Sequence, residues 1–221
     1  MRAQQAHSIP RSGRRERRRV ETRERIYRAA LALFAERGFM ETTVEDITEA
    51  ADVGKGTFFN YFPTKQHVLA TYGAERVATV ERALALAKTG AGPVIEILHE
   101  LATDLAGQSK ESPALLRAIY GAHAADANVR GELQRRMNTA RRALAQIFRL
   151  AQARGEVRRD LSAPVMARQM QLVFHGIMSS WSLNPRGSLR ATAEEIWNVF
   201  APALQPADAH LAATDRRRRP R

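Results

Sequence analysis

Several features that mark other classes of protein are missing from this chain of 221 residues. It contains no cysteine, which excludes a disulfide framework and thiol chemistry. No stretch approaches the roughly 18 consecutive apolar residues of a membrane span, and no apolar run follows the first arginines, as a secretory leader requires. We therefore expect a cytoplasmic protein that has no contact with a membrane.

The alternation of apolar and polar residues that is typical of β-strands is absent as well. Apolar residues recur instead at spacings of three and four, which predicts an all-α protein of about nine helices. A compact three-helix bundle should come first and a larger helical domain should follow. The expected helices run from about 20–22 to 37, then over 44–51, about 54–62, 64–89, 94–107, 113–124, about 127–153, 163–182 and 189–203.

Residues 43–63 carry the pattern of two short helices with a tight break between them. Thr43 precedes the first helix and Asp46 follows three residues later, which is the pattern of a capping box. Pro63 should end the second helix, because a residue before proline avoids the α conformation. Two helices joined by about three or four residues match the helix-turn-helix motif, whose second helix enters the major groove of DNA. The alternative is an ordinary helical hairpin, but the polar exposed face and the glycines that open the second helix favour DNA binding.

The second helix of this motif offers side chains that suit DNA. Lys55 can reach a phosphate or the O6/N7 edge of guanine, and Thr57 can bind a phosphate or touch a thymine methyl group. Asn60 lies one turn further on and suits adenine. Tyr61 and Lys65 flank this surface, where we expect them to hold the DNA backbone.

The positive charge of the chain is concentrated at its two ends. Residues 1–28 hold ten arginines against three glutamates, a net charge of +7, and residues 215–221 hold five arginines against one aspartate, a net charge of +4. Since the whole chain carries +12, the body between them is almost neutral at +1. A basic arm beside a helix-turn-helix favours DNA as the partner, rather than a merely solubilising role. For Arg216–Arg219 we expect only a solubilising tail.

The segment from Arg23 to Leu69 resembles the TetR family of bacterial transcriptional regulators, and this similarity covers about 47 residues. Besides the apolar pattern of the first helix, the matching positions are Gly38, Phe39, Thr43, Val44, Ile47, Ala51, Val53, Gly56, Thr57, Phe62 and Lys65. The resemblance implies a homodimer with N-terminal DNA-binding domains and C-terminal domains for ligand sensing and dimerisation. The DNA contacts that it implies are Thr43, Lys55, Gly56, Thr57, Asn60, Tyr61 and Lys65.

On this basis the chain divides into four parts. A disordered basic arm (1–19) precedes the helix-turn-helix domain (20–65), and a ligand-binding and dimerisation domain (66–205) precedes a disordered basic tail (206–221). The sequence departs from the family pattern at three positions of the motif. Asp52 replaces the usual turn glycine and must adopt a left-handed or bridge conformation, Gly54 replaces a serine or threonine cap, and Phe59 replaces a frequent tyrosine.

Two-fold symmetry would place two recognition helices about 34–36 Å apart, which matches one turn of DNA. We expect the dimer interface in the last two long helices, because their apolar residues exceed what one bundle face can bury. The candidates are Ile177, Met178, Trp181, Ile196, Trp197 and Phe200. The alternative places both tryptophans in the core of a single chain.

A mostly apolar pocket for an unidentified small molecule should lie among the helices between residues 94 and 182. The candidate lining residues are Leu101, Leu105, Tyr120, His123, Met137, Met170, Phe174 and His175. The alternative is that these positions form plain core, which is the more common fate of apolar residues at helical spacing.

Catalytic constellations are incomplete in this sequence. Glu96 and His99 form half of a carboxylate di-metal motif that has no second copy, and Ser179 and Ser180 lack the glycine-flanked turn of serine hydrolases. We therefore expect no enzymatic activity, no metal site and no cofactor. The leading hypothesis is a ligand-released repressor that binds a palindromic operator as a dimer. The alternatives are a ligand-independent architectural DNA-binding protein and an interaction module controlled by another protein.

Overall fold

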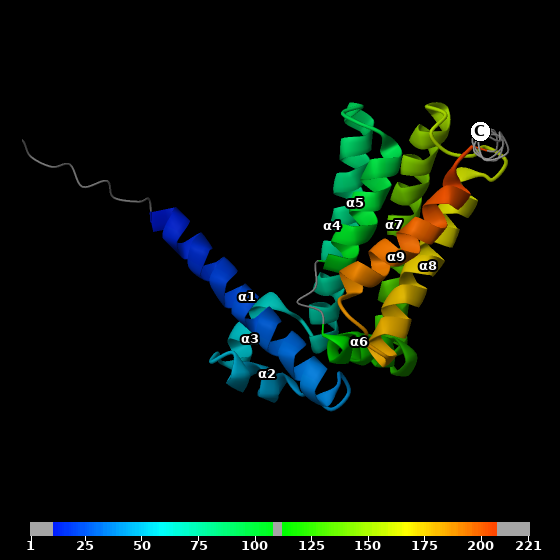
Figure 1. The fold of residues 1–221 in the computed structure, drawn as a ribbon. Helices are drawn as coiled ribbons and strands as arrows, with labels where there is room; N and C mark the ends of the chain where they lie inside the picture. Colours follow the sequence, from blue (N-terminus) through cyan, green and yellow to red (C-terminus); the bar gives the residue numbers. More distant parts are fainter. Residues whose placement is uncertain (1–10, 108–111, 207–221) are drawn as a thin grey trace, which may run out of the picture.

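The computed structural model describes residues 11–107 and 112–206, and within these ranges the chain forms nine α-helices and no β-strand (Figure 1). The expected all-α class is confirmed. The helices are α1 (Arg11–Arg37), α2 (Val44–Ala50), α3 (Lys55–Tyr61), α4 (Lys65–Thr89), α5 (Val94–Gly107), α6 (Pro113–Ala125), α7 (Ala127–Ala153), α8 (Ala163–Leu183) and α9 (Leu189–Leu204). Residues 1–10 of the expected arm and residues 207–221 of the expected tail lie outside the described ranges.

The first helix is longer than the sequence pattern predicts. It begins at Arg11 and not near Val20, so the expectation of disorder is wrong for residues 11–19. Every side chain from residue 13 to residue 20 is exposed. Arginine and glutamate have high helix propensity, so the helix continues here without an apolar face that would reveal it in the sequence. This outer part of α1 projects from the body of the protein (Figure 1).

The core of the N-terminal bundle extends beyond the first three helices. Phe34, Ile47 and Phe58 are fully buried in it, and Leu115 of α6 and Val129 of α7 belong to the same cluster. A three-helix unit of this size has little core of its own, and the next domain supplies the remainder. The N-terminal bundle and the rest of the chain are therefore in direct apolar contact.

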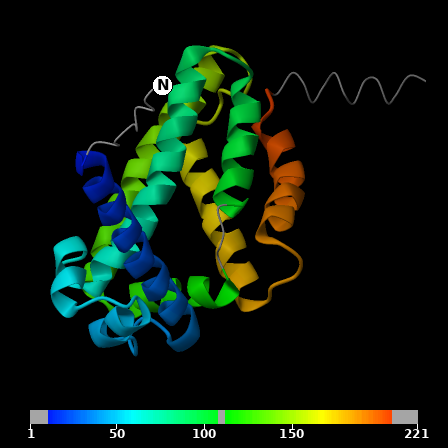
Figure 2. The same ribbon diagram turned by 90° about the vertical axis from the view of Figure 1, so that its left-hand side faces the viewer.

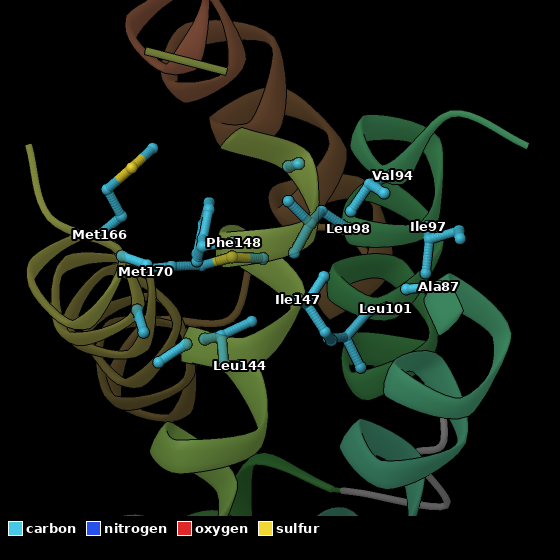
Figure 3. Packing of buried hydrophobic residues seen from close by; sticks show 14 of the residues in the cluster. Ala87, Val94, Ile97, Leu98, Leu101, Leu144, Ile147, Phe148, Met166 and Met170 are labelled. Atoms are coloured by element: carbon cyan, nitrogen blue, oxygen red, sulfur yellow. The ribbon is translucent and has the colours of Figure 1, made fainter. Parts of the chain in front are cut away.

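The larger domain is a bundle of the long helices α4, α5, α7, α8 and α9. Figures 1 and 2 show α6 lying across one end of these helices, next to α1. In the core of the bundle, Leu98 of α5, Ile147 and Phe148 of α7 and Met170 of α8 converge (Figure 3). No helix in the described ranges combines the length and the apolar character needed to cross a bilayer.

Side-chain caps fix where several of these helices begin. The Ser112 hydroxyl accepts from the Leu115 N–H at 3.1 Å, and the Ser188 hydroxyl accepts from the Ala191 N–H at 3.1 Å. Asp126 accepts from two N–H groups at the start of α7. Each cap satisfies amides that have no partner within the helix, so the breaks on both sides of α6 are encoded locally.

Candidate nucleic-acid interface and internal cavity

The start of α2 is organised by the predicted capping box. The Asp46 N–H donates to the Thr43 hydroxyl at 3.1 Å, and the Thr43 N–H donates to the Asp46 carboxylate at 2.8 Å. The hydrogen bonds that Asp46 accepts from Thr43, first that from the hydroxyl and then that from the backbone N–H, lower the pKa of Asp46. The Thr43 hydroxyl also donates to Asp46 at 2.7 Å, so both donors of Thr43 are used inside the protein. In this conformation Thr43 positions α2 and offers no donor to a phosphate.

The turn between α2 and α3 depends on Asp52. Its φ angle is +49°, the left-handed conformation expected for this position, and it is the one non-glycine residue with positive φ in the described ranges. Gly54 is the N-cap of α3 and makes no side-chain capping bond. Neither Gly54 nor Gly56 has positive φ, and a Cβ atom at either position would meet open space. The fold itself therefore does not require these glycines, whereas close approach of a DNA backbone would.

The two sides of α3 differ sharply. Phe58 and Phe62 are buried, while Lys55, Gly56 and Asn60 are exposed. Thr57 and Tyr61 are half-buried at the borders of the exposed side. The structure thus places all five predicted contacts of this helix on or beside one accessible surface. Sequence reasoning overlooked Phe59, which is 50% exposed on the same helix and can touch a thymine methyl group.

Lys55 is not free on this surface, because its ammonium group forms an ion pair with Glu45 in the first turn of α2. The hydrogen bond from Lys55 is the main cause of a lowered pKa at Glu45. Both side chains are more than half exposed. DNA must therefore compete with Glu45 for Lys55, an arrangement that the helical spacing of the sequence did not reveal.

Lys65, which we expected to hold the DNA backbone, uses its ammonium group for contacts within the protein. Its ammonium group donates to the backbone oxygens of Phe39 at 2.8 Å, Met40 at 3.1 Å and Thr42 at 2.8 Å. It also lies 4.6 Å from the centre of the Phe39 ring. Burial lowers the pKa of Lys65. All three donors of the ammonium group are used, so Lys65 ties the start of α4 to the loop between α1 and α2.

Replacing Lys65 by methionine should lower the free energy of unfolding by about 1–3 kcal/mol, since three carbonyl groups lose a charged donor. The slope of DNA affinity against salt concentration should stay unchanged. A phosphate contact would behave differently, because its loss reduces that slope by about one per site. Denaturant unfolding and DNA titration at several salt concentrations measure both quantities. If the salt slope fell and the free energy of unfolding stayed unchanged, Lys65 would instead be a contact of the DNA.

The larger domain encloses a cavity of about 140 Å³ between α4, α5, α6, α7 and α8. All eight residues predicted from the sequence line it: Leu101, Leu105, Tyr120, His123, Met137, Met170, Phe174 and His175. The predicted range was too narrow, because Tyr72, Arg76, Val77 and Val80 of α4 also line the cavity. These α4 residues follow the same helical periodicity as the core, which gave no sign that they face a hollow.

Burial disfavours the charged form of both histidines that line the cavity. Burial is the main cause that lowers the pKa of His123, to about 4, and it also lowers the pKa of His175. His175 Nδ1 lies 2.8 Å from the backbone oxygen of Gln171, and the Tyr120 hydroxyl donates to the backbone oxygen of His175 at 3.4 Å. His123 Nδ1, in contrast, is buried without a hydrogen-bond partner.

Helix α6 faces both the cavity and the N-terminal bundle. Leu115 and Ala122 belong to the core of the N-terminal bundle, Tyr120 and His123 line the cavity, and Ile119 does both. Figure 1 shows α6 next to α1, at the end of the long helices. Helix α6 therefore connects the cavity to α1, which in turn packs against α2 of the helix-turn-helix.

The predicted interface residues are only partly available to a second chain. Met178 is buried in the core, and Trp197 is 9% exposed and stacks on His99 at 5.2 Å, so these two assignments are wrong. Ile177, Trp181 and Phe200 are half-buried against the core, and Ile196 is exposed. The most exposed apolar side chains of α8 and α9 are Leu172 (58%), Leu183 (73%) and Val199 (76%), of which the sequence analysis missed Leu183 and Val199.

Comparison with known proteins supports the assignment of the helix-turn-helix. The family described as "Bacterial regulatory proteins, tetR family" matches residues 26–72. The probable acrEF/envCD operon repressor of Escherichia coli K12 is 25% identical, over 83% of this chain and 88% of that protein.

Two solved structures extend the similarity to the larger domain. The Thermus thermophilus FadR, a TetR-family transcriptional repressor in complex with lauroyl-CoA, is 29% identical with a TM-score of 0.59, over 82% of this chain and 94% of that chain. The Salmonella enterica GusR is 27% identical with a TM-score of 0.64, over 83% of this chain and 95% of that chain.

Proposed function

The chain belongs to the TetR family of bacterial regulatory proteins, and from this premise we propose that it is a DNA-binding transcriptional repressor. It binds a palindromic operator as a homodimer and leaves the operator when a small molecule fills the cavity. The exposed side of α3 is the observation that carries this proposal. The named relatives are regulators, and the proposal includes no catalytic activity. Its site of action is the cytoplasm, where bacterial DNA lies.

The reading of DNA is assigned to α3. Lys55 and Asn60 are placed to contact base edges or phosphates, and Thr57 and Tyr61 border them. Gly56 leaves open space in which the DNA backbone can approach. Lys65 and Thr43 use their hydrogen-bond donors within the protein and are not part of the proposed contact set.

Dimerisation is assigned to the outer faces of α8 and α9. Leu172 and Leu183 on α8 and Val199 and Ile196 on α9 expose apolar surface that a monomer leaves in water. An isologous contact between two copies would bury this surface and present two α3 helices to one face of DNA. A single α3 reads only a half-site, so dimerisation doubles the sequence that is recognised.

Release is assigned to the contacts of α6 with α1. An effector in the cavity touches Ile119 and Tyr120, and the opposite side of α6 packs in the core of the N-terminal bundle. An effector that fits one position of α6 better than another shifts the spacing of the two recognition helices. The complex of the Thermus FadR with lauroyl-CoA supports a small-molecule effector here, since the folds agree over most of both chains.

The outer part of α1 adds non-specific attraction to DNA. Residues 11–19 hold six arginines and one glutamate, a net charge of +5. Deleting residues 1–19 should weaken DNA binding and flatten its salt dependence, since counterion release scales with the phosphates that are neutralised. The unfolding midpoint should hardly change, because every side chain at 13–19 is exposed.

Titrating labelled DNA with the full chain and the shortened chain, at salt concentrations between about 50 and 200 mM, tests this assignment. A shortened chain whose DNA affinity and salt slope equal those of the full chain would exclude the arm and the outer part of α1 from the interface.

A further inference from the structure

A second hollow of about 290 Å³ adjoins the cavity, and the two share seven lining residues. The second hollow reaches solvent, since its residues His67, Asn128 and Arg135 are exposed. The inner cavity is lined mostly by apolar side chains. We call the shared boundary the neck; its residues are Tyr72, Gly73, Arg76, Ile119, His123, Leu133 and Arg136.

The neck contains buried polar atoms that have no hydrogen-bond partner. Among the described residues, two buried side-chain nitrogen or oxygen atoms have no hydrogen-bond partner, and these are His123 Nδ1 and Arg136 Nε. Both residues belong to the neck. A buried polar atom without a partner costs about 1–3 kcal/mol, so two at one place call for an explanation. A ligand group that binds at the neck and accepts hydrogen bonds would be such an explanation.

The positive charge of the arginines at and beside the neck favours a negatively charged ligand group. Arg135 and Arg136 share the single carboxylate of Glu132, each through a terminal nitrogen at 2.6 Å, so this group of three keeps one positive charge. A third guanidinium, that of Arg76, donates to the Tyr72 hydroxyl at 3.3 Å and to the Leu105 backbone oxygen at 3.1 Å. An arginine N–H only donates, so the matching ligand group is an acceptor, and an anionic acceptor binds best.

The backbone of α4 makes room for this arginine. A Cβ atom at Gly73 would lie 2.9 Å from Arg136 Cδ, closer than such contacts occur. Glycine in the interior of a helix costs about 0.5–1 kcal/mol relative to alanine. The glycine thus allows the Arg136 side chain to lie against α4 at the neck.

We propose that the effector is an amphipathic anion, whose apolar body fills the inner cavity and whose carboxylate or phosphate group accepts from Arg136 Nε at the neck. This inference rests on the proposed function, because it names the chemical class of the molecule that causes release. An inner cavity of about 140 Å³ matches a body of about six to eight carbon atoms, since a cavity of about 150 Å³ holds benzene. The outer hollow leaves space for a larger group beyond the anion.

Calorimetric titration of the full chain without DNA tests the proposal. The probes are octanoate, octan-1-ol and octylamine, which share a chain and differ in the charge of one end. Octanoate should bind at least about tenfold more tightly than octanol, and octylamine should be the weakest. Octanoyl-CoA forms a further arm: binding of this thioester but not of octanoate would identify a nucleotide-linked anion, which also satisfies the proposal. Equal affinity for octanoate and octanol, or binding of none of the probes, would overturn it.

Two arginine variants test where the anionic group of the ligand binds. Arg136→Met should weaken octanoate binding by about ten- to a hundredfold and leave octanol binding unchanged. Arg142→Met is the matched control, since it removes the same charge from an exposed position of α7 outside both hollows and should bind octanoate as the wild type does. Unchanged octanoate affinity in Arg136→Met would overturn the proposal. If this variant does not fold, the comparison of octanoate with octanol on the wild type decides.

Titrating the operator complex with the same probes separates this inference from the proposed function. Octanoate that binds through Arg136 but leaves the DNA complex intact would contradict release while the ligand class stands. An octanol preference that accompanies release of DNA would contradict the ligand class while the proposed function stands.

Discussion

Replacing both Leu172 and Val199 by aspartate should lower the affinity for the operator by about three orders of magnitude. Both side chains project from the outer faces of α8 and α9 and are more than half exposed in the single chain. Four new carboxylates at a two-fold contact repel one another and remove the apolar surface that holds the copies together. A monomer then binds only one half-site, and the affinity falls toward that of non-specific binding.

Sedimentation and DNA titration measure the two parts of this effect. The wild type should sediment as a dimer at micromolar concentration and the double variant as a monomer. Leu86→Asp is the control, because Leu86 is also an exposed leucine (43%) but lies on α4, outside the proposed interface. A double variant that remains dimeric, or a wild type that is monomeric, would contradict the assignment of the interface to α8 and α9.

Replacing Lys55 by alanine should weaken operator binding by about tenfold per half-site, and so by about a hundredfold for the dimer. If Lys55 contacts a phosphate, the salt slope should also fall by about two, one for each copy. Replacing Glu45 by glutamine should have the opposite effect. It frees Lys55 from its ion pair and removes a negative charge beside the DNA, with an expected gain of up to about fivefold per half-site.

The two substitutions also control each other. Both positions are exposed, so neither variant should change the free energy of unfolding by more than about 0.5 kcal/mol. Combining Lys55→Ala with Glu45→Gln should abolish the part of the gain that comes from the freed Lys55 charge, and should keep only the part that comes from removing the negative charge. Unchanged affinity in both single variants would remove Lys55 and its ion pair from the mechanism.

The helices of the larger domain could be predicted from the sequence because their signals are local. Apolar periodicity and the Ser112, Asp126 and Ser188 caps act within one or two turns, and the observed helices follow them closely. The start of α1 was predicted too late for the same reason. Periodicity reports a buried face, and a helix made of exposed arginines has none.

The errors concern contacts between distant parts of the chain. Lys65 reaches carbonyl groups that precede it by 23 to 26 residues, and no local pattern encodes that path. Trp197 and Val199 are both apolar residues of α9, yet one is buried and the other is exposed. Composition alone does not tell which apolar side of a helix meets its own chain and which is left for a second copy. The unpartnered nitrogen of Arg136 likewise depends on the packing of α7 against α4 at Gly73.

Selecting the fragments that the full chain retains from a pool of random DNA duplexes tests the central claim most directly. The account predicts one enriched palindrome, with half-site centres about 10 base pairs apart or a multiple of that spacing, because two α3 helices read successive turns of one DNA face. Loss of the enriched palindrome in Asn60→Ala would assign the reading to α3. The account would be contradicted if all DNA sequences were retained equally, or if a single motif without two-fold symmetry were enriched.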